Sequence, residues 1–100
     1  MEENVKKELE TIKGMVLRWK QSYFGWATSE GGNDYLIGEF SEEISTYVSP
    51  LVRRLHETDH LSLFEHNEFM ESCYSQIKEL RDLIKIKEAE NKQPQKGIWA

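Results

Sequence analysis

Large apolar side chains recur at alternating steps of four and three residues near the start of the chain. The members of this stripe are Val5, Leu9, Ile12, Val16, Trp19 and Tyr23. Because an α-helix has about 3.6 residues per turn, this spacing places all of them on one helical face. We find no alternation of apolar and polar residues that would indicate a strand. The chain must therefore bury helical faces against one another, which predicts an all-α fold.

Two later segments carry the same spacing. The second stripe consists of Ile37, Phe40, Ile44, Tyr47, Leu51 and Leu55, with Val48 and Val52 beside it. The third stripe consists of Met70, Cys73, Ile77, Leu80 and Ile84, with Phe69 and Leu83 beside it. Three amphipathic helices joined by short loops predict an up-down-up bundle.

Local signals predict where these helices begin and end. Gly31 and Gly32 indicate a loop between the first two helices, because glycine tolerates positive φ. Ser62 and Glu65 form the S-x-x-E pattern of a capping box, which predicts that the third helix starts near Leu63. The second helix is then expected to end near residue 57 or 58.

Pro50 lies inside the second stripe. A proline removes a backbone donor and collides with the carbonyl four residues earlier, so the second helix either bends there or ends and restarts as two abutting helices. Because the apolar stripe continues across Pro50, we expect a kinked helix. The bundle forms one domain over residues 1–90. A flexible polar tail is expected at residues 91–100, ending in an apolar tip of Ile98 and Trp99 that either docks on the bundle or binds a partner.

Charge and composition exclude several classes of function. The formal net charge is −5, and Arg53 and Arg54 are the only basic residues among many acidic ones in residues 30–71, which argues against binding to nucleic acid. No apolar run approaches the roughly 20 residues that a membrane helix needs. The single cysteine, Cys73, fits a reducing compartment and predicts a cytoplasmic protein.

All three histidines lie within residues 56–66. His56, Glu57 and His60 match H-E-x-x-H, in which two histidines one helical turn apart bind Zn²⁺ and the glutamate activates a metal-bound water. His66 falls at the offset of a third ligand, so this stretch resembles the metzincin motif. The resemblance covers residues 56–66 alone, with Leu63 in place of the motif's glycine and without the upstream substrate-binding strand of that family.

Two other interpretations compete for the same stretch. A helix end between His56 and His60 favours a structural corner, in which imidazoles pack or bind free carbonyls. Residues 57–68 also have the length of an EF-hand loop, but Leu61 and Ser62 occupy positions that need an oxygen ligand and a glycine. Metal binding remains the alternative function. The residues of this alternative zinc site are His56, His60, His66 and Glu57.

Nothing else in the sequence indicates catalysis. Cys73 lies on the apolar stripe, where a buried thiol is expected rather than a nucleophile. The heptad spacing and the apolar tip predict a non-catalytic adaptor, regulator or assembly subunit that acts by protein–protein contact, with a homodimer as one form of that contact. A further alternative is an acidic inhibitor that covers a basic site on another protein.

Overall fold

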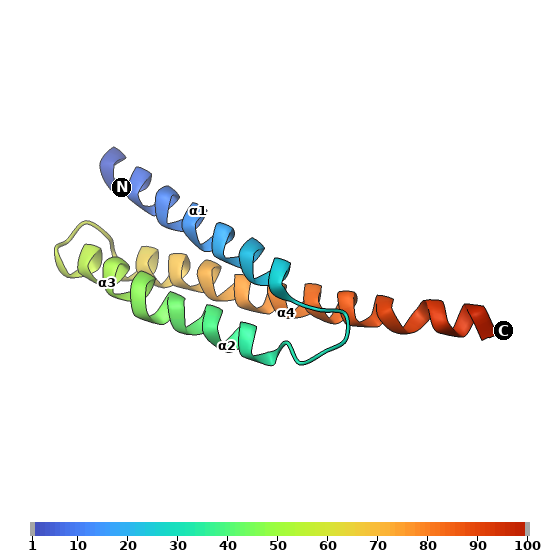
Figure 1. The fold of residues 1–100 in the computed structure, drawn as a ribbon. Coiled ribbons are helices and arrows are strands. Elements are labelled where there is room, and N and C mark those ends of the chain that lie inside the picture. Colours follow the sequence, from blue (N-terminus) through green and yellow to red (C-terminus); the bar gives the residue numbers. More distant parts are fainter. Residues whose placement is uncertain (1, 100) are drawn as a thin grey trace.

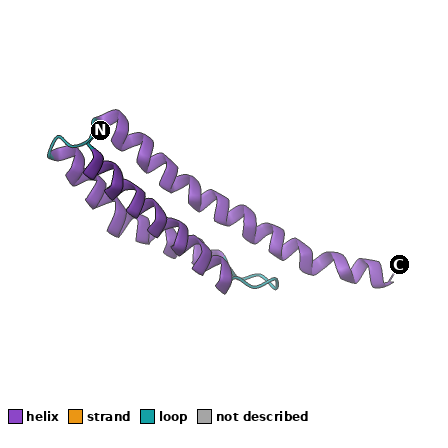
Figure 2. Ribbon diagram, turned by 90° about the horizontal axis from the view of Figure 1, so that it is seen from above, coloured by secondary structure: helices purple, strands orange, loops and turns teal. Residues whose placement is uncertain are grey.

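The computed structural model describes residues 2–99, and the side chains of residues 2–90. Its elements are α1 (Glu3–Trp26), α2 (Asp34–Glu43), the π-helical turn η1 (Ile44–Val48), α3 (Ser49–Glu57) and α4 (Leu63–Trp99). Because α2, η1 and α3 follow one another without a break, they form one helical run over residues 34–57. No strand occurs in the described residues (Figure 2), and the predicted all-α class is confirmed.

The three helical stretches run up, down and up. Figure 1 shows α1 running away from the N-terminus, the α2–η1–α3 run returning beside it, and α4 running back along both. Helix α4 packs against α1, α2 and α3, so it is the element that holds the other two stretches together. The predicted up-down-up bundle is therefore confirmed.

The core matches two of the three predicted stripes. On α1, Trp19 is half-buried, and the other five members of the stripe are buried. On α4, Ile77 is half-buried, and the other four members are buried. These two helices keep the ordinary α-helical pitch along the core, so a heptad stripe in the sequence remains on one face.

The second helical run buries a different set of residues from the predicted stripe. The buried residues are Leu36, Phe40, Ile44, Val48 and Val52, each four positions after the last. Tyr47 and Leu51 are 59% and 43% exposed. The assignment of Tyr47 and Leu51 to the core was therefore wrong, and the positions beside them, Val48 and Val52, take their place.

The π-helical turn η1 explains this change of face. The Ser49 N–H donates to the Ile44 carbonyl, five residues earlier rather than four. A turn that holds one extra residue rotates every later side chain by about 100° relative to a regular α-helix. That rotation brings Val48 and Val52 onto the core and moves Tyr47 and Leu51 to the edge of the bundle.

Pro50 lies two residues after the end of η1, in the first turn of α3. In a regular α-helix its ring would collide with the Thr46 carbonyl, which would also lose its hydrogen-bond donor. The helical run continues across the proline with η1 immediately before α3. The kink expected at Pro50 stays a prediction, while the change in helical pitch is found one turn earlier.

The loop between α1 and α2 is fixed to α4 by polar contacts. Gly31 and Gly32 take φ of 101° and 74°, as their turn requires. The buried Asn33 side chain accepts from the Thr28 N–H at 3.0 Å, donates to the Thr28 carbonyl at 2.8 Å, and donates to Glu88 of α4 at 2.9 Å. This end of the bundle is therefore closed by one buried amide that joins the loop to α4.

The predicted tail, residues 91–100, lies outside the part of the chain whose side chains the structure describes. The bounds of α4 extend to Trp99, but the side chains of residues 91–100, including Ile98 and Trp99, are among those not described. The flexible tail, its apolar tip and the domain boundary at residue 90 stay predictions.

The register set by η1 predicts losses of stability of different size at two adjacent positions. Val48→Ala removes two methyl groups from a fully buried site, so we expect it to lower the free energy of unfolding by about 2 kcal/mol. Tyr47→Ala is expected to lower it by about 1 kcal/mol or less, because the ring is mostly exposed and loses only its tilted contact with Trp19. Urea titration of both variants measures this difference, and a larger loss for Tyr47→Ala would contradict the π-helical register.

Candidate functional site

The chain turns between His56 and His60. Helix α3 ends at Glu57, and Asp59 takes a positive φ of 65°. The N–H of His60 then donates to the Leu55 carbonyl at 2.8 Å, which closes the turn. The two histidines therefore do not lie one turn apart on a single helix, as the H-E-x-x-H motif requires.

The structure brings two of the three histidines together. The rings of His56 and His66 lie 5.8 Å apart between centroids. His60 is exposed and lies 3.7 Å from Glu2, and Glu57 is also exposed. Among the side chains that the structure describes, no three of His, Cys, Asp or Glu are grouped so as to hold a metal ion. The zinc site therefore stays a prediction in which two of the four proposed ligands are adjacent.

His56 has a structural partner at this corner. Its Nδ1 lies 3.0 Å from the Leu61 carbonyl oxygen, a distance at which the ring N–H donates to that carbonyl. Leu61 is buried, so the contact attaches the loop to the end of the core. The imidazole therefore binds a carbonyl at this corner, but that carbonyl belongs to the loop and not, as we expected, to the last turn of the helix.

The capping box predicted at the start of α4 is also present. The Glu65 N–H donates to Ser62 Oγ at 3.0 Å, and the Ser62 N–H donates to Glu65 Oε1 at 2.9 Å. The hydrogen bond from the Ser62 backbone lowers the pKa of the Glu65 carboxyl. The corner at residues 56–66 is thus built from helix-terminating and helix-starting contacts.

Cys73 is inaccessible, as its position on the apolar stripe predicted. The residue is 2% exposed, and burial raises the pKa of its thiol to about 11. At neutral pH the group is an uncharged thiol packed in the core, which does not suit it to act as a nucleophile.

A solvent-exposed groove lies between α1 and the second helical run. We call it the aromatic groove and define it by Met15, Trp19, Thr46, Tyr47, Pro50 and Leu51, which line a recess of about 520 Å³. The rings of Trp19 and Tyr47 lie 6.4 Å apart between centroids, one from each side of the groove. The rotation at η1 is what places Tyr47 and Leu51 here instead of in the core.

An acidic recess adjoins the aromatic groove toward α2. It has a volume of about 310 Å³ and is lined by Tyr23, Glu39, Glu42, Glu43, Thr46 and Tyr47. The Tyr23 hydroxyl donates to the Glu43 carboxylate. Burial and this hydrogen bond raise the pKa of Tyr23 above its usual range. Because Thr46 and Tyr47 line both recesses, they form one continuous surface.

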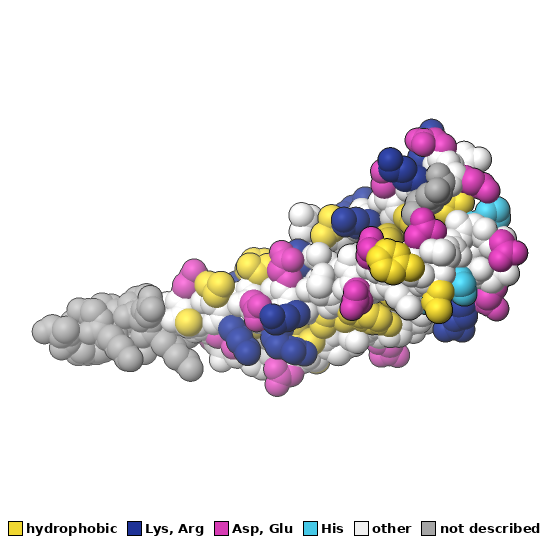
Figure 3. All heavy atoms as spheres, turned by 180° about the vertical axis from the view of Figure 1, so that it is seen from behind, with side chains coloured by type: hydrophobic (Ala, Val, Ile, Leu, Met, Phe, Trp, Pro, Cys, Tyr) yellow, Lys and Arg dark blue, Asp and Glu magenta, His cyan; other side chains and the backbone are white. Residues whose placement is uncertain are grey.

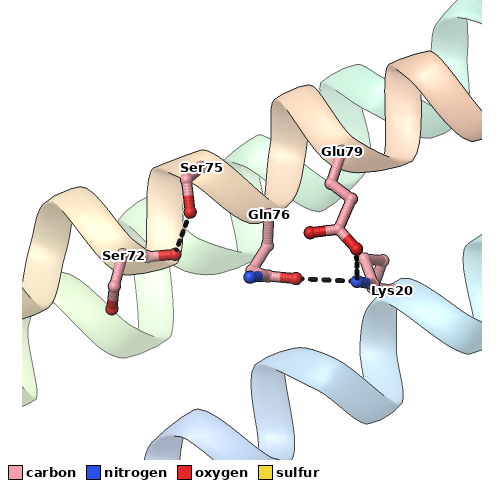
Figure 4. A network of polar contacts seen from close by, with 5 residues as sticks. All are labelled: Lys20, Ser72, Ser75, Gln76 and Glu79. Atoms are coloured by element: carbon pink, nitrogen blue, oxygen red, sulfur yellow. Dashed lines mark hydrogen bonds and ion pairs between the residues drawn. The ribbon is translucent and has the colours of Figure 1, made fainter.

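Helix α1 is bound to α4 along the side away from the aromatic groove. Lys20 Nζ donates to Gln76 Oε1 at 2.8 Å and pairs with Glu79 Oε1 at 2.9 Å (Figure 4). Near the end of α1, Lys87 Nζ donates to the Ala27 carbonyl at 2.7 Å. One side of α1 is therefore fixed by α4, and the side that carries Trp19 forms a wall of the aromatic groove.

A second apolar surface lies between α1 and the start of α4, around Leu9, Phe64 and Phe69. Phe64 is 74% exposed, but the rim of this surface mixes Lys6 and Lys13 with several glutamates. In Figure 3, hydrophobic side chains likewise lie among side chains of both charges at the end of the molecule where the histidines lie. A mixed rim selects for the charge of a partner less strongly than a uniformly acidic one.

Sequence reasoning missed the aromatic groove. The acidic region recognised at residues 30–71 includes Glu39, Glu42 and Glu43. The prediction, however, assigned Tyr47 and Leu51 to the core. The strict four-residue spacing of the alternative stripe is the signal that was available, because such spacing drifts off one face of an α-helix unless a wider turn corrects it.

No family model, curated protein or solved structure matches this chain. In the part of the chain that the structure describes, no helix is both long enough and apolar enough to cross a membrane. Function is therefore inferred from the exposed groove and its charges.

The corner at residues 56–66 predicts unequal roles for two histidines. We expect His56→Ala to lower the free energy of unfolding by about 1 kcal/mol, because it removes the hydrogen bond to Leu61. His60→Ala is expected to change it by less than about 0.5 kcal/mol. Thermal melts of both variants and the parent, with and without a chelator, provide the measurement. A chelator-dependent fall in the parent's Tm would show instead that a bound metal stabilises this corner.

Proposed function

We propose that this protein is a non-catalytic interaction module, an adaptor, regulator or assembly subunit, and that the aromatic groove is its contact surface. The observation that supports the proposal is the exposure of Tyr47 and Leu51 beside Trp19 in one groove. Aromatic side chains that line a groove between helices are typical anchors of protein interfaces.

The fold does not need Tyr47 and Leu51 for its own core. The buried stripe of the second run passes through Val48 and Val52, and Tyr47 stands outside it. Covering roughly 100 Å² of one tyrosine ring would contribute about 2.5 kcal/mol to association, at about 25 cal/mol per Å². Burial of the groove by a partner therefore offers a favourable free energy that the isolated chain leaves unused.

The partner is either another protein or a second copy of this chain. Either kind of partner would cover the aromatic groove. Either is also compatible with a cytoplasmic protein whose single thiol is buried. An inhibitor that covers a basic site on its target is a special case, in which the acidic recess contributes most of the contact.

Photo-crosslinking from the groove tests this proposal. A photoreactive phenylalanine analogue at Tyr47 is expected to give discrete crosslinked products in cells, because this side chain lies in the contact surface. The matched control carries the same analogue at Glu71, an exposed position on α4 outside both recesses. Adding Leu51→Asp is expected to remove the Tyr47 products without changing the melting temperature.

Light scattering of the purified protein separates the two kinds of partner. A dimer that becomes monomeric with Leu51→Asp identifies a second copy as the occupant, and a monomer with persistent Tyr47 crosslinks identifies another protein. Equal crosslinking from Tyr47 and Glu71, or none from either, would rule out the aromatic groove as the contact surface.

A further inference from the structure

We infer that the aromatic groove and the acidic recess together bind a basic amphipathic α-helix of a partner protein. This inference rests on the proposed function and specifies the chemistry of the occupant. Three properties of the surface lead to it: its shape between two helices, its apolar walls, and the sign and placement of its charges.

The shape suits a helix. The aromatic groove lies between α1 and the second helical run, which are antiparallel neighbours that both pack on α4 (Figure 1). A helix laid along it would complete a four-helix bundle by the usual packing of ridges into grooves. Met15, Trp19, Tyr23 and Trp26 follow one edge of α1 at steps of four, four and three, a length of about 17 Å. About three turns of a partner helix would cover that edge.

The walls require apolar anchors on that helix. Trp19 on one side and Tyr47 and Leu51 on the other expose aromatic and aliphatic surface. A helix that presents leucine-sized residues at positions i, i+4 and i+7 would place them along these walls. The face of the partner helix that enters the aromatic groove is therefore apolar.

The charges require basic residues beside those anchors. Glu39, Glu42 and Glu43 line the acidic recess, and no Lys or Arg is among the described residues that line it. The bond from Tyr23 holds Glu43 in place, while Glu39 and Glu42 are exposed to solvent. Lys or Arg side chains of a helix in the adjoining groove would reach these carboxylates, which favours a basic partner and disfavours an acidic one.

The charge also differs between the two ends of the surface. Arg54 follows Leu51 by three residues on α3, so it lies on the same side of that helix, one turn farther from the acidic recess. The surface is therefore acidic near α2, whereas Arg54 and Glu57 offset each other near the end of α3. A partner helix is then oriented with its basic residues next to α2.

Peptide binding to the full chain tests this inference. The probe is a synthetic Leu/Lys amphipathic helix of about 16 residues, with a Leu/Glu peptide of the same pattern as its control. We expect the Leu/Lys peptide to bind, the Leu/Glu peptide to bind at least tenfold more weakly, and affinity for the Leu/Lys peptide to fall as salt is raised. Fluorescence anisotropy of labelled peptide measures each affinity.

Two matched double variants locate the electrostatic contribution. Glu39→Gln with Glu42→Gln is expected to weaken binding about fivefold at low salt, and to reduce its dependence on salt. Glu68→Gln with Glu71→Gln removes the same charge from exposed positions on α4 outside both recesses and is expected to change affinity by less than twofold. Leu51→Ser is expected to weaken binding about tenfold at every salt concentration. Glu43 is left intact in all of them, because its bond with Tyr23 belongs to the fold.

Several outcomes would overturn the inference. Equal losses from the two double variants would show non-specific attraction to an acidic protein. Equal binding of the two peptides, or no binding of the Leu/Lys peptide, would exclude a basic helix. If crosslinks from Tyr47 persist unchanged in the Glu39→Gln, Glu42→Gln variant, the groove is still an interaction surface and only the basic chemistry of its occupant is wrong. A homodimer broken by Leu51→Asp would make the occupant a second copy.

Discussion

The hydrogen bond from the Ser49 N–H to the Ile44 carbonyl determines how the rest of the second helical run faces the bundle. Because it spans five residues, it adds one residue to a turn and rotates everything after it. Val48 and Val52 become core residues, and Tyr47 and Leu51 become surface residues. The core packing and the exposed groove are thus two consequences of the same local change in pitch.

The groove also depends on how α1 is held. Lys20 binds Gln76 and Glu79, and Lys87 binds the Ala27 carbonyl, so both contacts attach α1 to α4. Charged hydrogen bonds of this kind constrain position and orientation more than they add stability. They leave the side of α1 that carries Trp19 facing the second run across an open recess.

The histidine corner shows how a short motif depends on its context. The zinc-protease spacing is present at His56, Glu57 and His60. That spacing brings both imidazoles to one metal ion only when a continuous helix carries them. The Ser62 and Glu65 capping box starts a new helix soon afterwards, and the chain must turn to reach it. That capping box was visible in the sequence, so the helix end between the two histidines was predictable, whereas the proximity of His56 and His66 was not.

The sequence by itself determined the helical class, the up-down-up order, the core faces of α1 and α4, and the start of α4. Each of these depends on contacts between residues a few positions apart, which spacing and capping patterns report directly. Only the tertiary structure decided which face of the second helical run is buried. It also decided that Trp19, Tyr47 and Leu51 lie next to three glutamates on one exposed surface. A π-helical turn forms where burial of Val48 and Val52 in the core of the bundle outweighs the preference for regular α-helical pitch, and that balance depends on neighbours distant in sequence.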